Sequence, residues 1–416
     1  MRIAFVTLPL ASHTYVFTAL ARILGERGHD IVFLGLPDQA RMVQDAGFDF
    51  IAFGESEFPD GEAKRRFDAL AAMRGEEGIT HIMQLLMKIG ESALNDGQSA
   101  LIESGANAAV LDFVVRGFEA VAIRCKCPYV HVSAALHSDY SGHTPMLFYD
   151  WKHEETPEAL ARNRAALKRF AQMTSPLRTK IQAYLEEGGV QLDWSDPYAL
   201  ISKRAWITQV PRAFDFPNPH WPPQFQHTGP FVDPHVRPHV EFPWDRLTGD
   251  PLIYASLGTM QSGSAALLRM IVEGAYKRGR QLVLSLGKNV RMEELGPVPE
   301  EVIVVQYAPQ LELLQRAALC ISHGGLNTVL ESLIHGVPIV AIPLTNDHPG
   351  TAARIAYTHT GRFLRPSDAS AERLRLLVDE VLADGSYAAA ASKMSRIIAA
   401  DAGFPRAINI VESALQ

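Results

Sequence analysis

The stretch "ISHGGLNTVLESLIHGVPIVAIPLTNDHPG", residues 321–350, contains the end of an apolar strand, a glycine pair, a helical run and a second apolar strand. This order forms a βαβ unit, which places its two strands parallel in one sheet. Glycines let a ligand approach the backbone closely, and the helix that opens at Asn327 and Thr328 offers unpaired N–H groups to an anion. The stretch therefore predicts a parallel sheet with a phosphate site at the carboxyl end of a strand.

The same alternation of strands and helices extends along most of the chain. In the first third, "IAFVTL" and "DIVFLGL" flank the amphipathic run "YVFTALARILGERG", and "AAVLDFV" and "CPYVHVSA" flank "GFEAVAIR". A second series contains "PLIYASLGT", "QLVLSLG" and "EVIVVQYAP" before it reaches the opening stretch. Because 416 residues suffice for two domains, the sequence predicts an α/β chain of two Rossmann-like halves with ligands in the crevice between them.

Changes in composition give the expected domain boundaries. We predict a first Rossmann-like domain over residues 1–210, with a charged helical insertion at about 137–200. A proline-rich and aromatic-rich linker is expected over 211–245, followed by a second domain over 246–395. An amphipathic helix is expected over 396–416.

Composition also limits the partners and the compartment. The chain is 47% hydrophobic and 20% charged, with a formal net charge of -7, which argues against nucleic acid as a partner. Three cysteines form no C-x-x-C motif and no His/Cys cluster, so we expect neither disulfides nor a zinc site, and a cytoplasmic location. We interpret the N-terminal apolar run as strand, loop and helix, and no run reaches the roughly 18 apolar residues of a spanning helix. At most a peripheral contact with a membrane is expected.

The residues alone leave the ligand of the opening stretch open. Neither G-x-G-x-x-G nor a P-loop is present, which argues against a dehydrogenase or an NTPase. Thr328 and Glu331 match a capping box, in which Glu331 would only satisfy the helix start. The alternative is that Glu331 binds two ribose hydroxyls. His323 is either a strand-end histidine bonded to backbone or a phosphate ligand.

The run from Tyr307 to Gly350 resembles the donor-binding signature of the family 1 glycosyltransferases, the UDP-glycosyltransferases. It carries aromatic-x-Pro-Gln, His-Gly-Gly, Asn-Thr, Glu, Gly-Val-Pro and Asp in one register. The segments "CPYVHVSAAL", "WITQVPRAFDFP", "HTGPF" and "IYASLGTMQSG" look closest to the bacterial zeaxanthin glucosyltransferases and macrolide-type enzymes within this family, and the resemblance extends over most of the chain. The resemblance implies the GT-B fold, in which two Rossmann-like domains face a central cleft and the C-terminal helix crosses back to the first domain.

The resemblance also implies roles for individual residues. Tyr307 would stack on the base, the Ala308 backbone would read the base edge, and Gln310 and Glu331 would lie at the ribose. The diphosphate would be bound by His323, Gly325, Asn327 and Thr328, with Ser256, Gly258 and Thr259 as a second phosphate-side loop. Asp347 and His348 would contact the sugar.

His348 departs from the family pattern. Most glucosyl-transferring relatives carry Gln at this position, and His differs in reach and in charge. UDP-glucose is the donor that we expect first, with UDP-galactose or dTDP-rhamnose as alternatives.

His13 and Asp112 each follow a strand of the first half, so both can reach the crevice. An Asp bonded to one ring nitrogen fixes the tautomer and leaves the other nitrogen as a base. In the resembled family this pair deprotonates the acceptor hydroxyl. The motif here has Ser12 where the family usually has Gly.

These expectations combine into an inverting glycosyltransferase that moves a hexose to a hydroxyl of an apolar small molecule, a polyphenol or a carotenoid-like lipid. No two aspartates stand two residues apart, so we predict no metal, and no cofactor beyond the nucleotide sugar. The candidate acceptor-binding residues are Met83, Met87 and Ser133, although the spacing of the methionines also fits a helix core. A GT-B epimerase or phosphorylase shows no signal in the residues. A non-catalytic nucleotide-sugar-binding protein is the alternative of another class.

Overall fold

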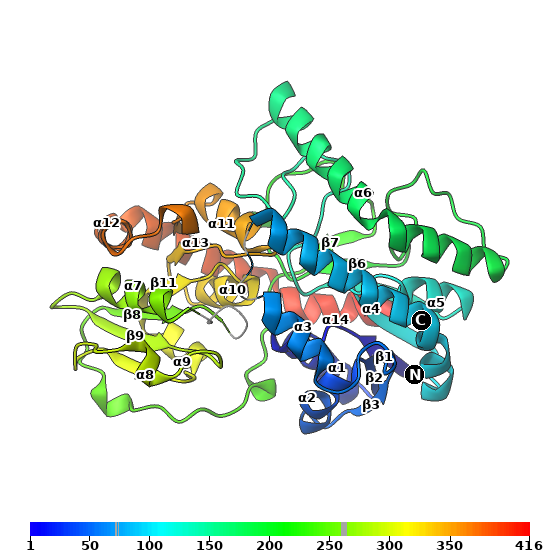
Figure 1. Ribbon diagram of the computed structural model, residues 1–416, viewed down its shortest axis with the longest axis horizontal. Coiled ribbons are helices and arrows are strands. Elements are labelled where there is room, and N and C mark those ends of the chain that lie inside the picture. The colour runs from blue at the N-terminus through cyan, green and yellow to red at the C-terminus, as the bar shows by residue number, and fades with distance from the viewer. Residues whose placement is uncertain (71–72, 74, 259–263) are drawn as a thin grey trace.

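The computed structural model describes residues 1–70, 73, 75–258 and 264–416. It contains two parallel sheets that lie side by side along the long axis of the molecule (Figure 1). The first has the strand order β3-β2-β1-β4-β5-β6-β7, and the second has the order β10-β9-β8-β11-β12-β13. This architecture confirms the predicted α/β fold of two Rossmann-like halves.

The first half contains β1 (Arg2–Val6), α1 (Ala11–Glu26), β2 (Asp30–Gly35), α2 (Ala40–Asp45), β3 (Asp49–Ala52), α3 (Glu62–Leu70), α4 (Gly75–Ser104), β4 (Ala108–Asp112), α5 (Phe118–Arg124), β5 (Tyr129–Ser133), α6 (Pro157–Glu187), β6 (Trp206–Thr208) and β7 (Phe225–His227). The second half contains β8 (Leu252–Ser256), α7 (Ala265–Ala275), β9 (Gln281–Ser285), α8 (Met292–Leu295), β10 (Ile303–Val305), α9 (Gln310–Leu314), β11 (Ala317–Ser322), α10 (Leu326–Ile334), β12 (Ile339–Ala341), α11 (His348–Tyr357), β13 (Gly361–Phe363), α12 (Ala371–Ala383), α13 (Gly385–Asp401) and α14 (Gly403–Leu415). Short 3-10 helices are η1 (Pro37–Gln39), η2 (Arg212–Phe214), η3 (Pro234–Val236), η4 (Trp244–Arg246) and η5 (Pro366–Asp368).

Each sheet is buried on both faces, which explains why its strands read as continuous apolar runs. Along β1, Ala4 and Val6 pack into one hydrophobic cluster, while Ile3 and Phe5 pack into another on the opposite face. The two clusters follow the two-residue period of a strand. The same division recurs along β8.

The predicted linker over 211–245 is wrong in part. Strand β7 lies inside it and pairs in parallel with β6, so the first sheet continues to His227. Between these strands, Val210 and the η2 residue Phe214 pack into the core of the second half, and the chain then returns. Because this stretch is rich in proline, its sequence did not indicate the three-residue edge strand β7. It also did not indicate the buried segment by which the chain crosses to the second half and returns.

The C-terminal boundary also differs from the prediction. The chain forms two helices, and the break lies at Ala402, which has a left-handed φ of 45°. Helix α13 packs on α10 of the second half, whereas α14 buries Ala407, Ile408 and Val411 against the first sheet. At the crossing, Gly403 lies so close to Thr228 that a Cβ would be 1.5 Å from the Thr228 carbonyl oxygen. The crossing segment is therefore α14, not 396–416.

The insertion contains a single long helix, α6, which begins at a Thr156 N-cap and projects from the rest of the first half (Figure 1). The segment over 137–156, predicted as helical, instead consists of turns that reach the second half. The carbonyl of Leu147 accepts from Gly350 N–H at 2.9 Å, and Arg365 Nε donates to Asp150 at 2.5 Å. Across the described residues, no helix combines the length and apolarity needed to cross a bilayer.

Candidate active site

His13 and Asp112 lie in contact at the carboxyl edge of the first sheet. Strands β1 and β4 are neighbours, so the start of α1, which follows β1, lies beside the last residue of β4. His13 Nδ1 is 2.6 Å from Asp112 Oδ2, and the Thr7 hydroxyl donates to the same oxygen at 2.6 Å. Asp112 is fully buried, and His13 is 9% exposed. Two residues 99 positions apart thus form one hydrogen-bonded unit.

The electrostatics of this pair suit a general base. Burial alone would lower the pKa of His13, but the charge and hydrogen bond of Asp112, helped by Asp347, outweigh burial and raise the pKa above its ordinary value of 6.5. When Nδ1 donates its proton to Asp112, Nε2 carries the lone pair that can accept a proton. A buried carboxylate also stabilises the imidazolium that forms.

On the opposite side, His323 is held between two glycines. It follows β11, and a Cβ on Gly325 would lie 2.3 Å from its Nε2, while one on Gly258 would lie 2.6 Å from its Cε1. Its ring also meets His348 edge to face, with ring centroids 4.5 Å apart. Burial and His348 lower the pKa of His323 to about 3, so the imidazole is neutral at pH 7. Its Nδ1 is buried without a hydrogen-bond partner, which fits a site that a ligand completes.

The N-terminus of α10 lies next to His323. Gly325 is the N-cap, and no side chain caps the helix, so its first N–H groups remain available to an anion. Thr328, in the first turn, receives a hydrogen bond from Gln310 at 3.4 Å. A capping box would need Thr328 as the N-cap, but the N-cap is Gly325. The capping box therefore does not explain Glu331.

Glu331 is 1% exposed and is bonded on both carboxylate oxygens. Gln310 Nε2 donates to one oxygen at 2.5 Å, and Arg237 donates to the other. The guanidinium of Arg237 also lies over the Tyr15 ring, 4.5 Å from its centroid. A ribose at Glu331 would have to share or replace these contacts.

Two predicted donor ligands join the halves directly. Asn327 Nδ2 donates to the carbonyl of Ser12 at 2.7 Å, and its Oδ1 accepts from Gln209 at 2.8 Å. Asp347 Oδ2 accepts from the N–H of Leu136 at 3.0 Å. Burial raises the pKa of Asp347, although the Leu136 bond and the nearby His13 oppose this shift. The start of α10 and Asp347 therefore face the His13 side of the cleft.

The other residues predicted to bind the donor lie near this side of the cleft, except one that is outside the described residues. Tyr307 is 47% exposed, a large fraction for an aromatic ring, and Ala308 beside it is partly buried. Ser256, the last residue of β8, accepts from Gly258 N–H at 3.3 Å. His348 Nδ1 accepts from Thr345 N–H at 3.2 Å. Thr259 lies outside the described residues.

Comparison with known proteins agrees with this geometry. Residues 271–413 match the family described as "Erythromycin biosynthesis protein CIII-like, C-terminal domain". The chain is 25% identical to demethyllactenocin mycarosyltransferase of Streptomyces fradiae, with 99% of this chain and 86% of that protein covered. It is 26% identical to zeaxanthin glucosyltransferase of Pantoea ananas, with 91% and 88% covered. The match to the uncharacterized UDP-glucosyltransferase YojK of Bacillus subtilis, at 29% identity, covers 46% of this chain and only 48% of that protein.

Solved structures show the same fold over the whole length. The glycotransferase of kitacinnamycin superposes with a TM-score of 0.76 at 23% identity, covering 100% of this chain and 99% of the other. The spinosyn rhamnosyltransferase SpnG complexed with thymidine diphosphate has a TM-score of 0.69 at 16% identity, with 98% and 100% covered. These similarities support placing the chain among the family 1 glycosyltransferases. It transfers a sugar from a nucleotide sugar, as the sequence analysis expected.

The three predicted acceptor residues lie buried or partly buried in the first half of this glycosyltransferase. Met83 is 6% exposed and belongs to the core of the first half, and Met87 packs against a smaller cluster under α6. Ser133 is 1% exposed and accepts from the Trp206 indole N–H at 2.9 Å. Met83 fits the helix-core interpretation, whereas Met87 is only partly buried against its cluster.

Three side chains at the site of the glycosyltransferase escaped the sequence analysis. Thr7 bonds Asp112, Gln209 bonds Asn327, and Arg237 bonds Glu331. Only Thr7 carried a usable signal, since it directly follows a predicted strand. Gln209 directly precedes the proline-rich stretch over 211–245 and Arg237 lies within it, and no local pattern indicates how this stretch crosses the cleft.

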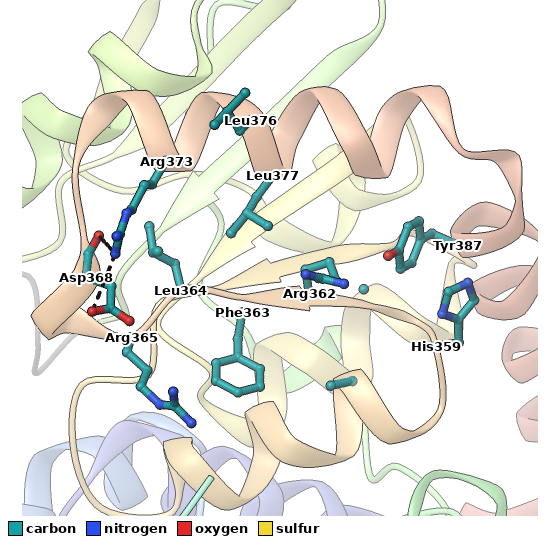
Figure 2. Close-up of a pocket in the computed structure, with 12 residues that line it drawn as sticks. His359, Arg362, Phe363, Leu364, Arg365, Asp368, Arg373, Leu376, Leu377 and Tyr387 are labelled. Carbon is teal, nitrogen blue, oxygen red and sulfur yellow. Dashed lines mark hydrogen bonds and ion pairs between the residues drawn. The ribbon is translucent and has the colours of Figure 1, made fainter. Parts of the chain in front are cut away.

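A separate groove lies on the outer side of the second half of this glycosyltransferase. It has a volume of about 490 Å³ and is formed mainly by β13, the segment after it, and α12, with Leu364, Leu376, Leu377 and Tyr387 on its walls (Figure 2). Arg373 closes one end by bonding Asp368, at 3.5 Å. The residues that line this groove include none of those predicted for the donor or for catalysis, so we do not assign sugar transfer to it.

Proposed function

We propose that this glycosyltransferase inverts the configuration of the transferred sugar in a single displacement, with His13 as the general base and Asp112 as its partner. The observation that carries the proposal is the His13–Asp112 hydrogen bond of 2.6 Å on one side of the cleft, with the uncapped start of α10 on the other. The Asn327–Ser12 bond brings these two sides together. The general base and the anion-binding start of α10 can therefore act in the same reaction.

The reaction follows from this arrangement. His13 Nε2 takes the proton of an acceptor hydroxyl while that oxygen attacks the anomeric carbon. The bond from that carbon to the diphosphate oxygen breaks on the opposite face, and its electron pair leaves with the nucleoside diphosphate. Asp112 stabilises the imidazolium, and the N–H groups of α10 with Thr328 receive the departing charge.

We propose UDP-glucose as the donor and an apolar molecule with a hydroxyl group as the acceptor. Two relatives support these classes: one is a zeaxanthin glucosyltransferase and another is a demethyllactenocin mycarosyltransferase. A dTDP-sugar is the second candidate donor, because the neighbour SpnG was solved in complex with thymidine diphosphate. UDP-galactose is a further candidate, because His348, whose ring contacts His323, stands at the position where a Gln is usual.

We further propose that catalysis needs no metal and no cofactor besides the nucleotide sugar. The support is that the helix N-terminus and neighbouring polar groups can meet the diphosphate charge. The three cysteines are free thiols, which fits a reducing cytoplasm.

The proposal is tested by incubating the purified protein with UDP-glucose, UDP-galactose or dTDP-rhamnose and a panel of phenols and a xanthophyll, read by mass. We expect an acceptor whose mass has increased by one hexosyl or deoxyhexosyl group, and NMR of the product should show an anomeric configuration opposite to that of the donor sugar. A product that retains the anomeric configuration of the donor sugar would contradict the single displacement. Donor binding without transfer to any acceptor, and without donor hydrolysis, would support a non-catalytic nucleotide-sugar-binding protein instead.

A further inference from the structure

Two histidines and a glutamate come together in the turns of segment 137–156. One ligand atom from each of His143, His153 and Glu155 lies within 4.8 Å of the other two. No C-x-x-C motif or His/Cys cluster marks these positions, and the sequence analysis expected no zinc site. The fold creates the cluster by turning the chain back on itself before α6.

The hydrogen bonding of the cluster is incomplete in a way that points to a ligand. The Nε2 atom of His143 and the Nδ1 atom of His153 are buried and have no hydrogen-bond partner. Leaving such an atom unpaired is costly. His143 Nε2 lies 3.4 Å from Glu155 Oε1 without a hydrogen bond, close to the roughly 3.3 Å that separates two ligands of one tetrahedral Zn²⁺ at ordinary bond lengths.

The surroundings hold the two rings in place. The turn before His143 is fixed by Asp139, which accepts four hydrogen bonds from Ser141 and Thr144. Asn163 of α6 donates to the His143 carbonyl at 3.3 Å. The His153 ring stacks on Phe216, with centroids 5.2 Å apart and planes at 22°. Ligands whose orientation is fixed before binding favour a specific metal site.

We propose that His143, His153 and Glu155 bind one Zn²⁺ ion that ties segment 137–156 together. Two imidazoles and one carboxylate are a ligand set that zinc accepts, and water or His220, whose ring centroid is 5.1 Å from that of His143, completes the coordination. The same segment contacts the second half through Leu147 and Asp150. The ion therefore stiffens a part of the first half that contacts the second.

The site is tested with the tag-free chain, stripped of metal by a chelator and titrated with ZnCl₂ in a calorimeter. We expect one ion per chain. Glu155→Gln, at a side chain that is 67% exposed and so tolerant of change, and His143→Gln should each weaken binding by about tenfold or more. His81→Gln, at an exposed histidine on α4, is the matched control and should leave binding unchanged.

Two further readouts keep the test independent of folding. The wild-type chain loaded with Co²⁺ should show the visible absorption of a tetrahedral site, and Zn²⁺ should protect segment 137–156 from limited proteolysis in the wild type but not in Glu155→Gln. Absence of stoichiometric Zn²⁺ binding, or equal binding by the wild type and both ligand variants, would overturn the proposal.

Discussion

The catalytic proposal depends on the hydrogen bond between His13 Nδ1 and the Asp112 carboxylate. The rate of a general base follows the fraction of neutral His13, and the pKa of His13 is raised above 6.5. Transfer should therefore fall as the pH drops through that raised pKa.

Asp112→Asn tests this electrostatic coupling. The substitution removes the negative charge that raises the pKa of His13, so the acidic limb of the pH–rate profile should move to lower pH. The maximal rate should fall by about 100-fold or more, because the amide no longer stabilises the imidazolium. A profile of kcat against pH for both proteins measures the shift, and an unmoved acidic limb would contradict the assignment.

Tyr307 tests the donor side at the same scale. Its ring is half exposed and available for stacking on a base. Tyr307→Ala should raise KM for the nucleotide sugar by about tenfold, since stacking of one base on one aromatic contributes roughly 1–3 kcal/mol. Tyr307→Phe keeps the ring and should keep the wild-type KM. Equal KM values for the alanine and phenylalanine variants would exclude stacking.

At the scale of elements, the loop between β11 and α10 depends on the absence of side chains around His323. A Cβ at position 325 would overlap the His323 ring, while the backbone of Gly325, with φ of −62°, suits any residue. Gly325→Ala should therefore act through displacement of the ring alone.

We expect Gly325→Ala to lower kcat/KM for the donor by about tenfold to 100-fold, in line with the roughly 1–3 kcal/mol cost of overpacking. Gly385→Ala, at the start of α13 where a Cβ meets nothing within 4 Å, is the matched control. Steady-state kinetics with varied donor separate the two. Similar kinetics for Gly325→Ala and Gly385→Ala would show that His323 does not take part in donor binding.

Helices and strands with a strong local sequence pattern could be predicted. Those that form only through contact with another part of the chain could not. The apolar runs of β1, β4 and β11 and the glycine-rich start of α10 are local features, and they located His13, Asp112 and His323. Strand β7 has three residues among prolines and exists only because β6 offers it an edge. Likewise, the burial of Met83 depends on which face of α4 meets the sheet, which the helical period alone leaves open.

At the scale of the molecule, the two halves are joined by a buried ion pair. Arg354 of α11 donates to Asp215 at 2.7 Å, and both side chains are almost fully buried. Burial alone would raise the pKa of Asp215, but Arg354 and then His137 outweigh it and hold the pKa well below 3.8. The stability that this group contributes is present above pH 3.8 and is lost as the pH falls through the depressed pKa.

Arg354→Met should destabilise the protein by about 3–5 kcal/mol at neutral pH, because Asp215 loses its strongest compensating charge. Arg362→Met is the control, since its pair with Glu380, at 3.3 Å, is largely exposed and contributes about 1 kcal/mol or less. Denaturant unfolding of both variants measures the difference. Equal free energies of unfolding would show that the interdomain pair is not a determinant of stability.

The rate of His13→Ala at saturating donor and acceptor, measured together with its affinity for the nucleotide diphosphate, tests the central claim most directly. The account predicts that product formation falls by about 100-fold or more while nucleotide affinity is unchanged, because His13 acts on the acceptor proton and not on the diphosphate. A His13→Ala protein that transfers sugar at the wild-type rate would contradict it.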